Sequence, residues 1–423
     1  MSFIADLHIH SSFSRATSPD MTLEGIWRWA QLKGITVIGT GDFTHPGWFN
    51  EITEKLEPAG NGLYSLKKAY LKQDIPQSCK ADVFFMLTGE VSCIYSKDKK
   101  TRKVHSILIV PDLATAAKIN INLSRIGNLK SDGRPIIGLD AKELLKITLD
   151  ASPDAMFIPA HIWTPHFSVF GAASGFDSLE ECFEELTPHI YAVETGLSSD
   201  PPMNWRLSCL DNITLVSNSD AHSPAKIGRE ANIFDGGISY MEMMEAIKTR
   251  KGFGGTIEFF PEEGKYHYDG HRNCGICLTP EQTRAYNYIC PVCNRHLTIG
   301  VMHRVISLAD RNHGAKPAGA PGYRSIIPLP EIIAETKKMG PGSKAVLSIY
   351  YKVISALGPE FKVLLESPYC DIEKVSDQLT MEAIVRMREG RVYISPGYDG
   401  EYGKIKIFED IERDSIKGQM SLF

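Results

Sequence analysis

The sequence predicts an α/β protein in which strands and helices alternate around a parallel sheet, closed or open, with a smaller, mainly helical region behind it. Three observations support this. Short β-branched and aromatic runs alternate with helix-like segments over about residues 1–255, which is typical of parallel α/β folds. The chain has 423 residues, of which 43% are hydrophobic, and this length exceeds one ordinary core. Beyond residue 258 the composition changes, first to cysteine pairs and then to basic segments.

The expected elements follow one another in a regular order. A strand is expected over residues 3–7. A helix is expected over residues 23–33, because Thr22 can cap its first turn and Gly34 can end it. Further strands are expected at 35–40, 83–87, 104–110, 155–159, 190–193 and 213–216, and further helices near 112–120, 140–150, 178–187 and 240–250.

Polar side chains gather where these strands end. His8 and His10 follow the first strand, and residues two apart on a strand point to the same face. Other strands carry or lead to further candidate ligands, which are Asp42, His45, Glu90, His105, His161, Glu194, Asp220 and His222. Ligands in parallel α/β folds lie at the carboxyl ends of the strands, and carboxylates gathered there would repel one another without cations. The sequence therefore predicts a cluster of divalent metal ions. Surface histidines and helix caps are the alternative for any one residue, but not for six strand ends.

These motifs resemble the PHP family (polymerase and histidinol phosphatase), whose members are metal-dependent phosphoesterases on a distorted (β/α)7 barrel. The matching residues are His8, His10, Glu90, His105, His161 and the run Ser219–His222. The family's second motif usually reads Asp-His, whereas Phe43 follows Asp42 here, so either His45 substitutes or that ligand is missing. The resemblance implies two or three ions (Zn, Mg or Mn) bridged by Glu90. It also implies catalytic roles for Glu90 and Asp220, and a role for Glu194 as ligand or catalytic carboxylate.

Four of the nine cysteines form two pairs, Cys274-x-x-Cys277 and, after 12 residues, Cys290-x-x-Cys293. Two such pairs are a strong signal for one tetrahedral zinc ion, and a site with four protein ligands is closed and structural. Four unrelated thiols are the weaker alternative. The sequence thus divides into a catalytic barrel at 1–258, a zinc-binding segment at 259–300, a basic, mainly helical DNA-binding domain at 301–408 and a flexible tail at 409–423.

The third segment is locally basic although the whole chain has a net charge of -5. Residues 295–352 contain nine Lys or Arg and three Asp or Glu, a balance that suits phosphate contacts, with a solvated helical face as the alternative. The residues expected to contact DNA are Arg304, Arg311, Lys337, Lys338 and Lys344. Helices are expected near 330–339, 343–357 and 380–389, and a hairpin over 393–408.

A PHP barrel, a four-cysteine segment and a basic helical domain together resemble the endonuclease Q family, and the resemblance covers essentially the whole chain. It implies nicking of DNA on the 5′ side of deaminated bases (uracil, hypoxanthine, xanthine) and of abasic sites. A damaged base would be flipped out for inspection, and Phe43, Trp163, His166 and Asn218 are the candidates for its pocket. Two rival readings are a small-molecule phosphoesterase and a catalytically inactive scaffold that binds DNA.

The last five residues, Gln419 to Phe423, resemble the Gln-Leu-Ser-Leu-Phe motif by which bacterial DNA enzymes bind the sliding clamp, with Met420 in place of Leu. The expected clamp-binding residues are Gln419, Leu422 and Phe423. The first residues contain no signal peptide, and an odd number of cysteines favours a reducing compartment. We therefore expect a cytoplasmic, nucleoid-associated protein.

Overall fold

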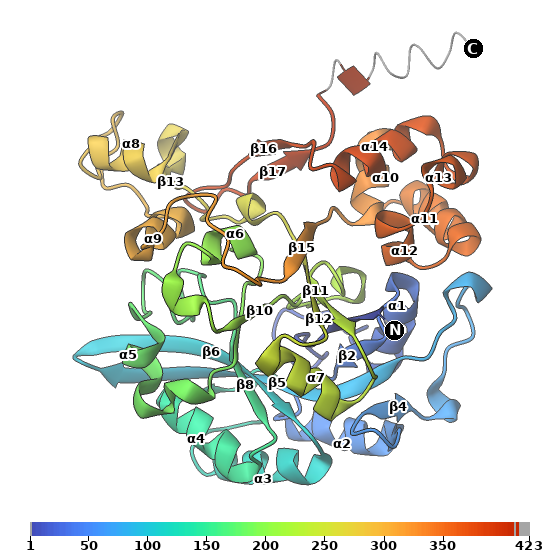
Figure 1. Ribbon diagram of the computed structural model, residues 1–423, viewed down its shortest axis with the longest axis horizontal. Coiled ribbons are helices and arrows are strands. Elements are labelled where there is room, and N and C mark those ends of the chain that lie inside the picture. The colour runs from blue at the N-terminus through green and yellow to red at the C-terminus, as the bar shows by residue number, and fades with distance from the viewer. Residues whose placement is uncertain (1, 410–411, 414–423) are drawn as a thin grey trace.

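The structure is a computed structural model that describes residues 2–409 and 412–413 (Figure 1). Within these residues, 11 strands form one mixed sheet, with the order β15-β12-β11-β1-β2-β5-β4-β3 and with β6, β7 and β8 joined through β5 and β6. The strands are β1 (Ser2–Asp6), β2 (Val37–Gly39), β3 (Leu56–Pro58), β4 (Tyr64–Leu66), β5 (Phe84–Lys97), β6 (Lys100–Val110), β7 (Ile136–Ile137), β8 (Met156–Pro159), β11 (Ala231–Asp235), β12 (Phe253–Glu258) and β15 (Gly322–Ser325).

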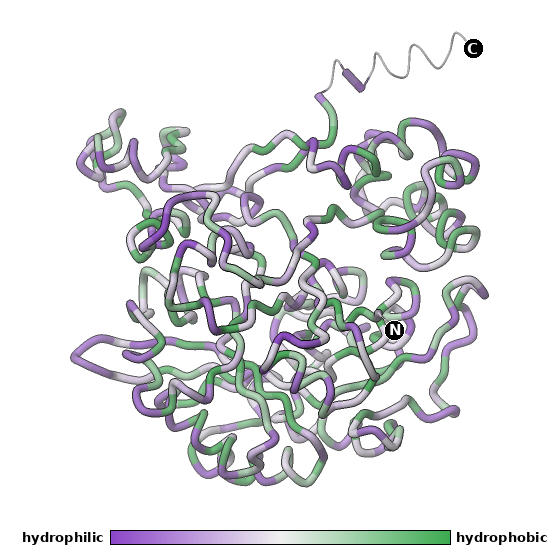
Figure 2. The backbone as a smooth tube through the Cα atoms, in the orientation of Figure 1, coloured by the Kyte–Doolittle hydropathy of each residue, from purple (hydrophilic) through white to green (hydrophobic). Residues whose placement is uncertain are grey.

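The pairing is only partly parallel. β1, β2 and β5 run parallel, as do β9 (Ala192–Glu194) and β10 (Thr214–Val216) in a separate two-stranded sheet. By contrast, β1 with β11, β5 with β6 and β6 with β8 are antiparallel, so the prediction of a parallel sheet is wrong for these pairs. β5 and β6 form a long hairpin because Asp98 and Lys99 both take positive φ (52° and 62°), the conformation of a tight two-residue hairpin turn. The hydrophilic tip of this hairpin extends at the left of Figure 2.

Helices cover the sheet largely as predicted. The first helix starts and ends at the expected residues, because the Thr22 side chain accepts a hydrogen bond from the N–H of Gly25 and Gly34 adopts a left-handed φ of 88°. Its apolar face, which includes Ile26 and Ala30, is fully buried in the main core. The helices of this part are α1 (Leu23–Lys33), α2 (Pro46–Lys55), α3 (Leu113–Ser124), α4 (Ala141–Ala151), α5 (Leu179–Phe183), α6 (Pro201–Asn204) and α7 (Tyr240–Thr249).

The rest of the chain forms a small cysteine-containing segment and a helical bundle, seen above the sheet in Figure 1. The segment contains β13 (Asp269–His271), β14 (Ile276–Leu278), α8 (Pro280–Ala285) and α9 (Val301–Leu308). The bundle contains α10 (Leu329–Lys337), α11 (Lys344–Leu357), α12 (Glu360–Leu365), α13 (Tyr369–Val375) and α14 (Gln378–Arg388), followed by the β16 (Tyr393–Ser395) and β17 (Lys404–Lys406) hairpin.

The predicted boundary at residue 301 does not match the packing. β15 lies beyond that boundary yet pairs in parallel with β12 at the edge of the large sheet. A Cβ on Gly255 would lie 2.0 Å from the backbone oxygen of Gly322, so glycine at residue 255 permits this close pairing. The bundle is held against α1 by the buried ion pair of Lys33 and Glu360, whose Nζ–Oε2 distance is 2.7 Å. The searched helices of the described residues include none that could span a membrane.

Candidate active site

Two sequence motifs far apart in the chain lie side by side at the end of β1. Ile9 forms a parallel bridge with Ala221, and the N–H of His10 donates to the backbone oxygen of Ala221 at 3.0 Å. This pairing fixes the His8 and His10 imidazoles beside Asp220, which adopts a positive φ of 46°. A non-glycine residue in the left-handed region is uncommon, and such residues cluster at functional sites.

Four of these side chains converge on one point. One ligand atom from each of His8, His10, Glu90 and Asp220 lies within 4.8 Å of the other three. His10 Nε2 is 2.9 Å from Asp220 Oδ1 and 3.2 Å from Glu90 Oε2. His8 Nε2, His10 Nε2 and Asp220 Oδ1 are buried and have no hydrogen bond of acceptable geometry to the described residues. Buried polar atoms of native proteins are normally satisfied, so this donor set fits a divalent cation.

A second group shares one carboxylate with the first. Glu90 Oε1 is 2.7 Å from His105 Nδ1 and 3.1 Å from His161 Nε2, while Oε2 of the same carboxylate faces His8 and His10. Glu90 is itself almost completely buried. The two oxygens therefore face two adjacent ligand groups, which is the arrangement required of a carboxylate that bridges two ions.

Two predicted ligands lie behind the imidazoles instead. Asp42 Oδ1 is 3.0 Å from His10 Nδ1, and its other oxygen accepts from the backbone N–H of Ser11 at 2.6 Å. Glu194 Oε1 is 3.0 Å from His8 Nδ1, and its other oxygen accepts from the backbone N–H of His161 at 2.9 Å. Neither carboxylate belongs to the two ligand groups. Their geometry is that of carboxylates that orient ligating histidines.

The structure places the two remaining predicted ligands outside both groups. The His45 side chain accepts from the N–H of Trp48 as the cap of α2, and its ring packs against Phe13, so its prediction as a ligand is wrong. His222 lies at the edge of the cluster, with its ring 4.5 Å from that of His10 and its Nδ1 2.9 Å from the backbone oxygen of Asp220. Phe43 stands where the usual motif has histidine, but Asp42 is present and still orients His10.

The electrostatics of the cluster favour cations. Burial opposes the charge of His8 and His10, but neighbouring carboxylates outweigh it and raise the pKa of both imidazoles well above the usual value. For His8 these carboxylates are Glu194 and Glu90. Burial likewise opposes ionisation of Asp220, but the close approach of the His10 imidazole and the charge of His8 hold the pKa of Asp220 far below its usual range. A metal ion bound at the two imidazoles would displace their protons and take over the pairing with these carboxylates.

Sequence reasoning missed one residue at this site and misplaced three others. The Arg134 guanidinium donates to Glu90 at 3.0 Å from a loop without an evident motif. Of the residues considered for a base pocket, Phe43, Trp163 and Asn218 are at most 1% exposed. Asn218 accepts from the backbone N–H of Leu7 and donates to Glu194, and is therefore part of the cluster's support. Among those four candidates, only His166 is exposed.

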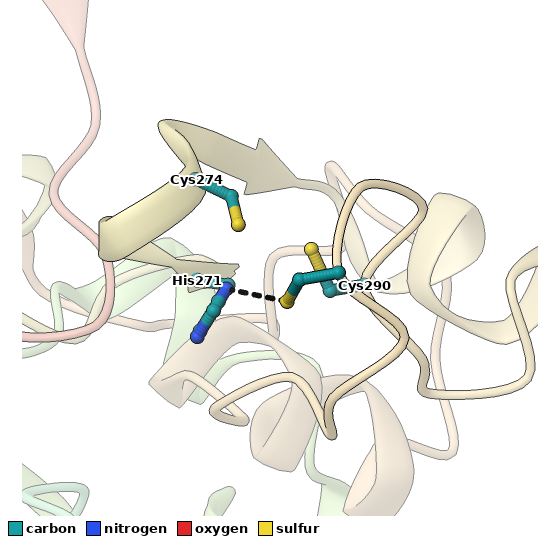
Figure 3. Close-up of side chains that lie close together, drawn as sticks. His271, Cys274 and Cys290 are labelled. Carbon is teal, nitrogen blue, oxygen red and sulfur yellow. Dashed lines mark hydrogen bonds between the residues drawn. The ribbon is translucent and has the colours of Figure 1, made fainter.

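The cysteine-containing segment holds a second cluster, but not the predicted one (Figure 3). One ligand atom each from His271, Cys274, Cys290 and Cys293 lies within 4.8 Å of the other three. Cys277 is outside this group, because it lies in β14 opposite Gly270 and its Sγ is 4.0 Å from the backbone oxygen of Pro396. The prediction of Cys277 as a ligand is therefore wrong, and His271 takes its place.

A shared backbone pattern explains why His271, and not Cys277, belongs to this group. The spacing His271-x-x-Cys274 is followed by Gly275 at φ 65°, and the spacing Cys290-x-x-Cys293 is followed by a left-handed residue at 57°. Both pairs therefore form the same kind of tight knuckle, whereas Cys277 continues into a strand. Burial opposes ionisation of Cys290, but hydrogen bonds to backbone N–H groups and neighbouring side chains lower its pKa to about 6, which favours the ligating thiolate.

Two of the predicted DNA contacts instead join parts of the protein. The Arg304 guanidinium donates to the backbone oxygens of Phe170 and Phe176 at 3.0 and 2.9 Å. Arg311 pairs with Asp211, with 2.6 Å between Nη1 and Oδ1. Because these guanidinium groups already have protein acceptors, they tie the segment after the knuckles to the sheet region.

The other predicted basic contacts lie on the helical bundle. Lys337 forms an ion pair with Asp377, Lys338 ends α10 in the left-handed conformation, and Lys344 is exposed at the start of α11. The expected clamp-binding residues Gln419, Leu422 and Phe423 lie outside the described residues.

Known relatives cover most of the sequence. An uncharacterised protein of Bacillus subtilis, YqxK, is 30% identical over 417 residues, which are 95% of this chain and 98% of that protein. An uncharacterised protein of Methanocaldococcus jannaschii, MJ0043, is 32% identical over 282 residues, which are 64% of this chain but only 35% of that protein. Residues 328–391 match the family described as the MJ0043 C-terminal domain.

The convergent imidazoles and carboxylates on this α/β fold form a donor set of the kind that metal-dependent hydrolases use. The structure is similar to that of the lesion-specific endonuclease PfuEndoQ from Pyrococcus furiosus, with 32% identity, a TM-score of 0.84 and coverage of 97% of this chain and 96% of that chain. It is also similar to endonuclease Q in complex with a 27-mer duplex that carries an abasic lesion, with 31% identity, a TM-score of 0.83 and coverage of 97% and 98%. The chain therefore belongs to the endonuclease Q family, whose members are hydrolases of DNA phosphodiester bonds.

Proposed function

We propose that this protein is a metal-dependent DNA repair endonuclease that nicks on the 5′ side of deaminated bases (uracil, hypoxanthine and xanthine) and of abasic sites. The observation that carries the proposal is Glu90, a buried carboxylate whose two oxygens face two groups of ligand atoms. The full-length similarity to a lesion-specific endonuclease supports DNA as the substrate. A distorted (β/α)7 barrel is the proposed description of the catalytic part.

We assign the cation-binding role to the side chains of the two ligand groups, with two or three ions of Zn, Mg or Mn in total. The ligands are His8, His10, Glu90, Asp220, His105 and His161. When bound, such ions neutralise the charge of the scissile phosphate and activate water for attack. Asp42 and Glu194 hold the imidazoles in one tautomer and orientation.

Asp220 has a distinct position among these residues. Its side chain is 25% exposed, whereas those of Glu90 and His10 are fully buried. Its low pKa keeps the carboxylate ionised. We assign to Asp220 the orientation of the attacking water and the acceptance of a hydrogen bond from it on the solvent side of the cluster.

The second cluster has a structural role in this proposal. His271, Cys274, Cys290 and Cys293 provide four ligands, which leaves no position for substrate on a tetrahedral zinc ion. A segment this short buries too little surface to hold its shape without the ion. Bound zinc would therefore fix the position of this segment beside the catalytic part.

The deciding experiment uses defined duplexes. Metal-loaded protein is incubated with duplexes that carry uracil, hypoxanthine, xanthine, an abasic site or no lesion, with Mg²⁺, Mn²⁺ or Zn²⁺ or with a chelator, and the cut is mapped at nucleotide resolution. Cleavage 5′ to the lesion that needs metal supports the proposal. Equal cleavage of undamaged DNA, or hydrolysis of small phosphomonoesters alone, would contradict it.

For the partner, we propose the bacterial sliding clamp, bound through Gln419, Leu422 and Phe423. These residues resemble a motif whose apolar side chains enter a hydrophobic pocket on the clamp. The test is isothermal titration of the full-length protein and of a Leu422→Ala, Phe423→Ala double variant against purified clamp. Equal affinity of the two proteins would contradict the proposal.

A further inference from the structure

The loop that precedes β7 is built to approach the active site closely. The N–H of Gly133 donates to the backbone oxygen of Phe13 at 3.0 Å, and Thr44 donates to the backbone oxygen of Gly133 at 3.2 Å. A Cβ at Gly133 would lie 2.3 Å from both Asp42 Oδ2 and Ser14 Oγ. Glycine therefore lets the loop backbone contact the carboxylate that orients His10, and this contact fixes where the next residue starts.

That next residue, Arg134, extends from the loop into the cluster. Its Nη1 is 3.0 Å from Glu90 Oε2, the oxygen that also faces His8 and His10. The Arg134 side chain is 28% exposed, whereas that of Glu90 is fully buried. Within the described residues this is the one hydrogen bond made by the guanidinium. Its other N–H groups are therefore available to a ligand on the solvent side.

The positive charge of Arg134 lies next to a carboxylate that is expected to hold cations, and this placement costs energy. Cations held by Glu90 would repel Arg134, because like charges at this separation are costly in a buried site. An anion that reaches the cluster from solvent removes that cost, and the planar fork of arginine matches the oxygens of a phosphate group. The pairing with Glu90 then keeps the side chain in place until the anion arrives.

We infer that Arg134 is a catalytic residue that binds a non-bridging oxygen of the scissile phosphate and stabilises the charge that develops there during cleavage. The inference rests on the proposed endonuclease function and adds a protein cation to its metal ligands. Arg134→Ala should lower kcat/KM for nicking about a hundredfold, and Arg134→Lys should restore part of that loss because it keeps the charge without the fork. Arg15→Ala is the matched control, since Arg15 is 78% exposed and pairs with Asp132 instead of the cluster.

Binding separates this role from a merely structural one. Fluorescence anisotropy compares two abasic duplexes whose scissile linkage is either a charged phosphorothioate or a neutral methylphosphonate, and metal content is measured in parallel. We expect Arg134→Ala to weaken binding of the charged duplex about tenfold and to leave the neutral duplex and the metal content unchanged. Equal weakening of both duplexes, or loss of metal, would overturn the inference in favour of a role in positioning Glu90. Unchanged nicking would overturn it outright. If the unaltered protein nicks no lesion, the proposed function fails, whereas the binding comparison still decides the phosphate contact.

Discussion

The two metal-ligand clusters of this protein differ in where their ligands come from. In the active site the ligands span residues 8 to 220 and are brought together by the large sheet and by the bridge between Ile9 and Ala221. In the cysteine-containing segment they span residues 271 to 293 and sit on two knuckles joined by a short helix. The first cluster uses imidazole and carboxylate atoms backed by further carboxylates, and the second uses three thiols and one imidazole.

In the active site the fold holds the metal ligands in place. In the cysteine-containing segment we expect the bound metal to hold the fold in place. The active-site ligands sit in a buried core that many apolar side chains form, so we expect metal removal to abolish activity and leave the structure intact. The knuckles have little core of their own, and their metal supplies folding energy. Thiolates also select zinc, whereas carboxylates and imidazoles accept several divalent ions.

The largest effect is expected from Asp220→Ala, which removes the solvent-facing carboxylate of the active site. Nicking of a uracil duplex should fall about a thousandfold or more, while the melting temperature stays within a few degrees of the unaltered protein. Asp235→Ala on the exposed end of β11 is the control. Full nicking by Asp220→Ala would exclude the proposed cluster as the catalytic centre.

The second cluster can be tested by comparing two cysteines. Cys290→Ser should lose the bound zinc, measured by mass spectrometry of the metal content, and should make the segment around 271–293 sensitive to proteolysis. Cys277→Ser should retain zinc and resist proteolysis, because Cys277 lies outside the group. Loss of zinc from both variants would restore the four-cysteine assignment, in which Cys277 and Cys290 are both ligands.

A smaller effect is expected when a carboxylate behind an imidazole is changed. Asp42→Asn keeps the shape but weakens the interaction with His10 Nδ1, so metal affinity in the active site should fall about 10- to 100-fold. Competition with a fluorescent chelator measures it. Asp140→Asn, which changes the cap of α4, is the control. A complete loss of metal from Asp42→Asn would mean that Asp42 is a direct ligand.

Local patterns gave the sequence analysis most of its success. The ends of α1 follow from the chemistry of Thr22 and Gly34, and the shared face of His8 and His10 follows from the period of a strand. The resemblance to the PHP family also implied a bridging role for Glu90, and the two oxygens of its carboxylate face the two ligand groups. The direction of β6 was missed, because it depends on two positive φ values in one turn.

The sequence could not show which residues contact a metal directly and which lie a few ångströms behind and orient the ligands. A carboxylate that ligates a metal and one that orients a ligand look the same in a motif, so Asp42 and Glu194 were expected as ligands. His271 was not predicted, because two Cys-x-x-Cys pairs already supply four ligands. The glycine after Cys274 was nevertheless a signal that His271 and Cys274 form the first knuckle. Arg134 lies in a loop whose path is set by tertiary contacts of its glycine neighbour.

The smallest expected effect is the pH dependence of stability, which should come from the active site. The folded-state pKa of His8 and of His10 is raised well above its usual value. In metal-free protein their stabilisation is therefore complete below about pH 6.5 and is lost as the pH rises from there through the raised values.

Urea unfolding of chelator-treated protein between pH 6 and 9 measures this loss. The metal-loaded protein should lack it, because ligating imidazoles are already neutral. A His8→Asn, His10→Asn double variant controls for the titration of other groups and should also lack it. A metal-free protein whose free energy of unfolding stays constant from pH 6 to 9 would show that the two imidazoles hold no protons, and the charge balance inferred for the cluster would then be wrong.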